Sequence, residues 1–382
     1  MKPNPLLENL FNVTLRRLQE EREQAARVLP ALLQSTRYAG WHTLKSDPEV
    51  RTCGALEYLG RRFAEELDRD TAQAHAIAQL AVAVADSLPG NAYPELILAQ
   101  LRAHAWKDLG KSYRNLGKIH ESLDALTHAD QHLDPFITCA YDHAVVRFNL
   151  AVTLQEADRF QESLHHLEEC QQVFADHGDT DNASNCVFWQ AVLFQRMKRY
   201  REARNILREL LDPQAKPQTV AAIHHALGFA AIELGDYDEA ESHLEQARLI
   251  YRELNLPLNI LRIEMGLGRL LVRRGNTDEA LILLSRVRRD FLSHRMVEEA
   301  GLCALESVDA LLRSNLPEAA ESTARAVLQE FTSAGLDKRA ISALGYLSEA
   351  IAAKQATSSD ITTVAEYIVS LRTNPERDLR LT

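Results

Sequence analysis

The chain has 382 residues, of which 46% are hydrophobic, 15 are Gly and 12 are Pro. Because Gly and Pro are scarcer than average, the composition argues against the many tight turns of an all-β sandwich or barrel. The hydrophobic content is high enough to bury a core, which argues against intrinsic disorder. The net charge of −11 disfavours general binding to the phosphate backbone of nucleic acids.

The five cysteines are scattered and none forms a C-x-x-C motif, so no zinc-ribbon or redox motif is indicated. Isolated thiols of this kind are typical of a reducing compartment. Acidic residues interrupt the N-terminal apolar stretch, and no apolar run reaches 18 residues, so neither a signal peptide nor a membrane span is predicted. We therefore expect a cytoplasmic protein that binds neither membranes nor nucleic acid.

The first elements along the chain form an N-terminal helical segment. Asn4 and Pro5 combine an N-cap with Pro at the first helical position. Pro30 is expected to break or kink the helix, and residues 36–43 are expected to form a loop or linker. The helix over residues 5–29 either docks on the rest of the chain as a cap or binds a partner through its amphipathic face.

A helix pair is predicted next, over residues 54–68 and 71–88, and a short pattern then recurs. Its copies are G-K-I-H-E-S at 117–122, D-R-F-Q-E-S at 158–163, K-R-Y-R-E-A at 198–203, G-D-Y-D-E-A at 235–240, G-N-T-D-E-A at 275–280 and S-N-L-P-E-A at 314–319. The small residues that close successive copies are 41, 40, 37, 40 and 39 residues apart. Such a fixed period is the sequence signature of a repeat architecture.

Each copy reads as the turn of a helical hairpin. Gly or a polar residue ends the first helix, and acidic residues follow in the first turn of the second helix, where the helix dipole favours negative charge. The small residue lies where the two helices approach each other closely. A single hairpin leaves one apolar face bare, so neighbouring hairpins must stack and form a solenoid.

The best copy carries a known signature. The stretch W-K-D-L-G-K-S-Y at 106–113 fits W-x2-L-G-x2-Y, with Trp106, Leu109, Gly110 and Tyr113 in place. The chain therefore resembles the tetratricopeptide-repeat (TPR) family, in a variety with a long period near 40 residues. The resemblance implies an all-α fold, a right-handed TPR-like α-solenoid of about seven antiparallel helix pairs. Gly110, Gly228 and Gly268 are expected where the two helices of a repeat cross.

Three segments follow from this interpretation. Residues 1–50 form the N-terminal helical segment, residues 51–355 form the TPR-like repeat array, and residues 356–382 form a C-terminal capping helix and tail. Within the last two segments, helices are predicted over 338–354 and 360–372.

Motifs for chemistry are few, so we expect no enzyme, no cofactor and no metal. The stretch G-L-G-R-L-L at 266–271 is interpreted as close helix packing because it follows no strand. Asp124, His128 and His132 share one predicted helix face and form a weak metal candidate. Cys139-x3-His143 and the His165-His166 pair are weaker still.

The TPR resemblance places the ligand-facing residues on the first helix of each repeat. Carried onto this chain, they form a concave groove with an apolar middle, Phe148, Phe188 and Phe229 lying one repeat apart, and basic flanks. The predicted groove residues are Lys107, Lys111, Arg114, Phe148, Asn149, Val152, Asn185, Phe188, Val192, His225, Phe229, Arg262, Arg269 and Arg273. Alternatively, the phenylalanines are covered by neighbouring helices or by the N-terminal segment.

The sequence thus predicts a non-enzymatic scaffold or adaptor that binds a protein or peptide, preferably an acidic or C-terminal segment. Asn149 and Asn185 are expected to bond the backbone of the peptide, as related TPR grooves imply. Two alternatives stay open: a peptide-responsive bacterial regulator, and a docking subunit for a separate effector enzyme. The first lacks the basic recognition helix that such regulators usually carry at the N-terminus.

Overall fold

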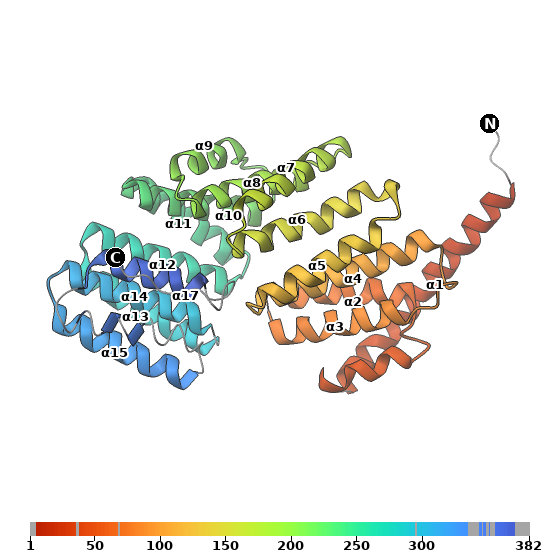
Figure 1. Ribbon diagram of the computed structural model, residues 1–382, viewed down its shortest axis with the longest axis horizontal. Coiled ribbons are helices and arrows are strands. Elements are labelled where there is room, and N and C mark those ends of the chain that lie inside the picture. The colour runs from red at the N-terminus through yellow and green to blue at the C-terminus, as the bar shows by residue number, and fades with distance from the viewer. Residues whose placement is uncertain are drawn as a thin grey trace. The chain divides into compact units, whose positions relative to one another are not determined.

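The computed structural model describes residues 5–35, 38–67, 69–294, 296–334 and 356–370, together with 344, 345, 347, 348 and 351. Within these residues every regular element is helical and no strand occurs, which confirms the all-α fold (Figure 1). The chain divides into two compact units, unit 1 (Met1–Ala183) and unit 2 (Ser184–Thr382).

The helices of unit 1 are α1 (Pro5–Ser35), η1 (Tyr38–Ser46), α2 (Cys53–Glu66), α3 (Thr71–Ser87), α4 (Glu95–Asn115), α5 (Ile119–Leu133), η2 (Ile137–Cys139), α6 (Ala140–Glu156) and α7 (Phe160–Asp176). Helix α8 (Thr180–Arg196) leads into unit 2. The remaining helices are α9 (Tyr200–Leu210), α10 (Pro217–Leu234), α11 (Tyr237–Glu253), α12 (Pro257–Arg274), α13 (Thr277–Ser293), α14 (Val297–Arg313), α15 (Pro317–Ala334) and α17 (Ser358–Ser370).

Successive helices pack as hairpins, and each hairpin packs on the next within its unit. In unit 1, α2 packs on α3, α4 on α5, and α6 on α7. In unit 2, the corresponding pairs are α10 with α11, α12 with α13, and α14 with α15. The predicted pair at 54–68 and 71–88 corresponds to α2 and α3. No described helix is long and apolar enough to span a lipid bilayer.

The turns inside the six hairpins from α4–α5 to α14–α15 each have one residue in the left-handed backbone region, five positions before a buried small residue. These left-handed residues are Gly117, Asp158, Lys198, Gly235, Gly275 and Asn315. The small residues are Ser122, Ser163, Ala203, Ala240, Ala280 and Ala320, all fully buried. The sixth copy is therefore shifted by one residue from its predicted register, because Asn315 takes the left-handed position and exposed Ala319 does not close the turn.

The expected close approach of the two helices is confirmed at three repeats. A Cβ atom on Gly110 would lie 2.6 Å from Leu126 Cγ, and one on Gly228 would lie 2.7 Å from Leu244 Cγ. A Cβ atom on Gly268 would lie 2.5 Å from Leu284 Cδ2. Gly266 also faces Leu244, so the G-L-G-R-L-L stretch serves helix packing, as predicted.

At Pro30 the expected break does not occur, because helix α1 runs through this residue to Ser35, and the expected kink stays a prediction. Leu29 is fully buried there, and this packing offsets the hydrogen bond that Pro cannot donate. The loop expected after this helix is wrong. Residues 38–46 form the 3-10 helix η1 rather than a loop, and the burial of Trp41 holds this helix on the core.

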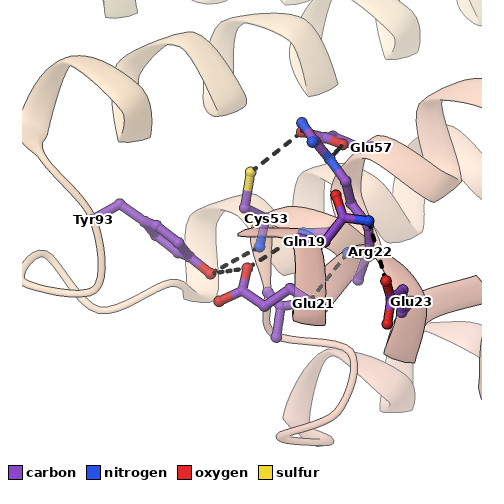
Figure 2. Close-up of polar contacts among 10 residues, drawn as sticks. Gln19, Glu21, Arg22, Glu23, Cys53, Glu57 and Tyr93 are labelled. Carbon is purple, nitrogen blue, oxygen red and sulfur yellow. Dashed lines mark hydrogen bonds and ion pairs between the residues drawn. The ribbon is translucent and has the colours of Figure 1, made fainter. Parts of the chain in front are cut away.

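A buried polar cluster fixes α1 on α2, which supports the docking alternative for this helix (Figure 2). The Tyr93 hydroxyl donates to Glu21 Oε2 at 2.7 Å and accepts from the Cys53 backbone N–H at 2.9 Å. Burial, together with Glu21, raises the pKa of Tyr93 to about 12. The backbones of α1 and α2 touch at Gly54, where a Cβ atom would lie 2.3 Å from the Glu21 carbonyl carbon. Arg22 and Glu57 add a bidentate ion pair at the surface.

The C-terminal end of unit 2 is closed by α17, which agrees with the predicted helix at 360–372. Ile361, Val364 and Ile368 of α17 are buried in a cluster with residues of α14 and α15. Most of the helix predicted at 338–354 and the predicted tail after residue 370 lie outside the described residues.

Candidate ligand-binding surface

All fourteen predicted groove residues lie on the first helices of their hairpins. In unit 1, Lys107, Lys111 and Arg114 are on α4, whereas Phe148, Asn149 and Val152 are on α6. The remaining eight form the first-helix face of unit 2: Asn185, Phe188 and Val192 on α8, His225 and Phe229 on α10, and Arg262, Arg269 and Arg273 on α12. The contacts of each unit are described separately below.

Helices α8 and α10 are joined by one aromatic and one amide side chain. The half-buried Phe188 packs against a cluster that includes Ala226 and Leu227 of α10. The buried Gln195 donates from Nε2 to the carbonyl oxygen of Ala226 at 2.7 Å. A neighbouring first helix therefore covers part of Phe188, and the rest of the ring stays accessible.

Phe229 lies at the centre of a cluster that joins α10 to α12. The guanidinium of Arg269 lies over the Phe229 ring, 5.4 Å from the ring centre. Tyr200, the first residue of α9, meets the same ring edge-on, with the ring centres 6.2 Å apart. Such a cation–π contact orients the cation while the aromatic surface stays partly exposed.

The basic residues of α12 form a ladder of ion pairs with acidic residues of α14. Arg262 lies 3.9 Å from Glu299, Arg269 2.5 Å from Glu306, and Arg273 2.6 Å from Asp309. Carboxylates one repeat further along therefore offset the positive charges of this predicted basic flank.

Among the three arginines, Arg269 is the most constrained. Burial acts to lower its pKa, but Glu306 and Glu233 outweigh burial and raise the pKa above its usual value. Arg262 is the least constrained, since its side chain is 43% exposed and lies 3.9 Å from Glu299. A ligand carboxylate can therefore reach Arg262 at a smaller cost than Arg269 or Arg273.

His225 is held neutral on the same face. Burial, with a smaller effect of the Arg262 charge, lowers the pKa of His225 to about 4. A neutral imidazole both donates and accepts hydrogen bonds, so His225 can bond to a peptide backbone without adding charge.

The basic residues of unit 1 are arranged differently. Arg114 donates from Nη1 to the Asn149 carbonyl oxygen at 3.2 Å and to Thr153 Oγ1 at 3.3 Å. Because both partners are neutral, burial lowers the pKa of Arg114 and Glu156 offsets this only in part. Lys107 lies 3.1 Å from Asp108, and Lys111 lies over the Phe63 ring.

The two predicted asparagines differ in accessibility. Asn149 is 8% exposed, and its side-chain amide donates to the Val145 carbonyl oxygen at 2.8 Å. Val152 beside it is buried. Asn185 is only partly buried, so it is the better placed of the two to bond a ligand.

Sequence reasoning missed Tyr200 and the acidic residues of α14. A signal for the latter was present: Glu299 and Glu306 follow Arg262 and Arg269 by 37 residues, and Asp309 follows Arg273 by 36. Opposite charges separated by one repeat length meet across neighbouring first helices. No comparable pattern identifies Tyr200, which reaches Phe229 from the start of a second helix.

The C-terminal helix borders this face. Lys198, in the turn between α8 and α9, pairs with Glu366 of α17 at 2.9 Å. Burial raises the pKa of Tyr200, and the charges of Glu233 and Glu366 add to this effect. Glu366 is thus close to the aromatic cluster around Phe229.

The described helices form stacked hairpins whose turns contain a residue with positive φ. This arrangement defines the chain as an α-solenoid. Two tetratricopeptide-repeat family models match it, one over residues 219–291 and the other over residues 186–212. Residues 186–212 and 219–291 thus contain tetratricopeptide repeats. No curated protein sequence matches it.

Several solved structures share this fold at low sequence identity. A Rap protein complexed with competence and sporulation factor is 15% identical with a TM-score of 0.52, covering 87% of this chain and 98% of that one. The Rap conjugation gene regulator of plasmid pLS20, in complex with the Phr peptide, is 13% identical with a TM-score of 0.53, covering 85% and 97%.

A third structure is a signal transduction ATPase with a tetratricopeptide-repeat sensor from Pyrococcus horikoshii. It is 13% identical with a TM-score of 0.57, and the match covers 94% of this chain. This chain spans only 53% of that protein.

Proposed function

We propose that this protein is a non-catalytic adaptor that binds a peptide or protein segment on the first-helix face of unit 2. The observation that carries the proposal is the row of partly exposed Phe188, His225 and Phe229 on neighbouring helices α8 and α10, next to Arg262 on α12. Aromatic anchors beside an arginine are typical of residues that dominate binding energy.

The similar structures support a peptide as the ligand. Two Rap proteins of the same fold are bound to competence and sporulation factor and to the Phr peptide. Sequence identities of 13–15% show a shared fold and nothing about the ligand. The proposed class of ligand therefore rests on the chemistry of the first-helix face of unit 2.

That chemistry favours a segment with an apolar side chain and one carboxylate. The apolar side chain packs on Phe188 and Phe229. The carboxylate replaces Glu299 as the partner of Arg262, whose existing pair is 3.9 Å long. Because carboxylates of α14 already pair with Arg269 and Arg273, we expect net charge to contribute less to affinity than the aromatic contacts.

A peptide library selected on the full chain tests the proposal. The best peptide is titrated by calorimetry against wild type, Phe188→Ala and Leu249→Ala. Leu249 is a matched control because it is an exposed apolar residue on the second helix α11. We expect Phe188→Ala to weaken binding by about fivefold or more, equivalent to about 1 kcal/mol, and Leu249→Ala to change it by less than about twofold.

The peptide affinity of the variant Phe229→Ala tests the same face independently. If both phenylalanine variants are folded by circular dichroism and bind as tightly as wild type, the ligand lies elsewhere and the proposal fails. If Leu249→Ala weakens binding instead, the site is on the second helices.

A second candidate function is a peptide-responsive regulator, favoured by the fold shared with the Rap conjugation gene regulator. It requires that peptide binding change the affinity for a second protein. A pull-down with and without the selected peptide separates the two candidates. A simple adaptor loses only partners that compete for the same face, whereas in a regulator Phe188→Ala abolishes the effect of the peptide on a partner that still binds this variant.

A further inference from the structure

A cluster of metal-ligand side chains lies in unit 1, away from the first-helix face of unit 2. Asp130 lies near the C-terminal end of α5, Asp134 follows the last residue of that helix, and His143 lies in the first turn of α6. One ligand atom from each residue lies within 4.8 Å of the other two. No other group of three such residues meets this criterion in the described part of the chain.

The present contacts leave the cluster prearranged. His143 Nδ1 lies 2.6 Å from Asp130 Oδ1, and Arg147 Nε lies 3.0 Å from Asp130 Oδ2. Two carboxylates and one guanidinium leave a net negative charge. Asp134 is exposed, so an incoming cation can reach the cluster from solvent.

We propose that Asp130, Asp134 and His143 bind one divalent transition-metal ion, of the Mn²⁺ or Zn²⁺ class. The ion takes the place of the hydrogen between His143 Nδ1 and Asp130 Oδ1, and His143 ligates as the neutral tautomer that carries its proton on Nε2. Arg147 keeps its bond to Asp130 Oδ2, as an outer partner that orients a ligating carboxylate. The remaining coordination positions are filled by water.

The geometry suits such an ion. Three atoms no more than 4.8 Å apart share a point within about 2.8 Å of each, and small side-chain rotations bring that distance to the roughly 2.0–2.2 Å of metal–ligand bonds. Two carboxylates with one imidazole suit Mn²⁺ and Zn²⁺, whereas Ca²⁺ prefers six to eight oxygen ligands. The C-terminal end of α5 contributes the negative end of its helix dipole.

Two neighbouring residues stay outside the proposed ligand set. The Nδ1 atom of His166 on α7 lies 3.8 Å from Glu169 Oε2. Cys139 is not one of the three residues whose ligand atoms lie within 4.8 Å of one another.

The site differs from the metal candidate that the sequence suggested on α5. His128 stacks on Trp106 with the ring centres 4.6 Å apart and the rings nearly parallel. Asp124 is exposed on the same helix as Asp130 and Asp134. Asp124→Asn is therefore a matched control for Asp134→Asn, with the same helix, exposure and charge change.

The test uses the full chain without an affinity tag, stripped with EDTA and titrated with Mn²⁺ under electron paramagnetic resonance. We expect one bound Mn²⁺ per chain, weakened about tenfold or more in Asp134→Asn and less than about twofold in Asp124→Asn. Zn²⁺ is expected to displace the bound Mn²⁺, because zinc binds imidazole-containing sites more tightly.

A second measurement separates a metal site from a structural ion pair. Mn²⁺ should raise the thermal midpoint of wild type and of Asp124→Asn but not of Asp134→Asn, because binding to the folded state alone stabilises it. The proposal is overturned if wild type binds no Mn²⁺ at millimolar concentration, or if folded Asp134→Asn binds it with unchanged affinity. Either result leaves Asp130, His143 and Arg147 as a structural ion-pair cluster only.

Discussion

Neighbouring first helices are joined by two kinds of contact, one in the region from α4 to α10 and the other between α12 and α14. From α4 to α6 and from α8 to α10, a polar side chain crosses to a backbone carbonyl: Arg114 to Asn149 and Gln195 to Ala226. From α12 to α14, arginines meet carboxylates, as Arg273 meets Asp309. In α10 and α12, the position that corresponds to Arg114 and Gln195 holds the buried Ile232 and Val272.

The two chemistries place different demands on the cation. Arg114 donates its hydrogen bonds to neutral oxygen atoms, and burial lowers its pKa more than Glu156 raises it, whereas the carboxylates around Arg269 raise the pKa of that residue. An anionic ligand therefore competes with neutral hydrogen-bond partners at Arg114 but with an internal carboxylate at Arg269. The count of basic residues on a repeat face is therefore a poor measure of the charge that a ligand meets.

The largest expected effect comes from breaking the ladder. Asp309→Asn removes the buried carboxylate that pairs with both Arg273 and Arg313 and leaves the partly buried Arg273 without an anionic partner. We expect a loss of about 3 kcal/mol in the free energy of unfolding, measured with urea. Glu279→Gln on the exposed face of α13 is the control and should change stability by less than about 0.5 kcal/mol. An equal change in both variants would mean that the ladder carries no stability.

The next effect depends on pH and involves His225. Its pKa is about 4 in the folded chain and near 6.5 when unfolded, so the unfolded state binds more protons between these values. The stability contributed by neutral His225 is therefore present above pH 6.5 and is lost as the pH falls towards 4.

We expect wild type to lose about 2 kcal/mol more than His225→Gln when urea unfolding is compared at pH 7 and pH 5. The difference between the two proteins is the diagnostic quantity, because burial also lowers the pKa of other histidines such as His224 and His243. Parallel pH profiles would show that His225 is solvated in the folded state.

The smallest effect is expected at a carbonyl-type junction. Gln195→Leu gives α8 the same kind of apolar side chain that Ile232 and Val272 supply in α10 and α12. Because the Ala226 carbonyl stays in its own helix ladder, we expect a change of less than about 1 kcal/mol in either direction. A loss above about 2 kcal/mol would mean that the amide bond, and not the filled space, holds α8 to α10.

Much of the fold could be predicted because each repeat carries its own local signals. Ser122, Ser163 and Ala240 marked the hairpins correctly, since a small residue is required wherever two helices cross. The sixth repeat was misplaced by one residue, because Ala319 and Ala320 are adjacent and only the backbone of Asn315 distinguishes them. Helix η1 was missed because it depends on the burial of Trp41, a tertiary effect.

The candidate site could be predicted only in part. The helix and face of Phe188, Phe229 and Arg269 follow from the repeat register alone. Their partners do not, because Tyr200 and Glu306 come from other helices and the sequence states no pairing. The predicted groove residues as a set remain a prediction that the binding experiment must test.

The pair between Lys198 and Glu366 has a consequence for folding kinetics. Repeat arrays fold through contacts between neighbours, which keeps the sequence separation of their contacts low. This contact joins residues 168 positions apart, so closing unit 2 requires a large loop whose entropy is lost late. During synthesis, α17 must leave the ribosome before that contact can form. Truncation before residue 358 would therefore change the surroundings of Tyr200, which lies near the start of unit 2 in the sequence.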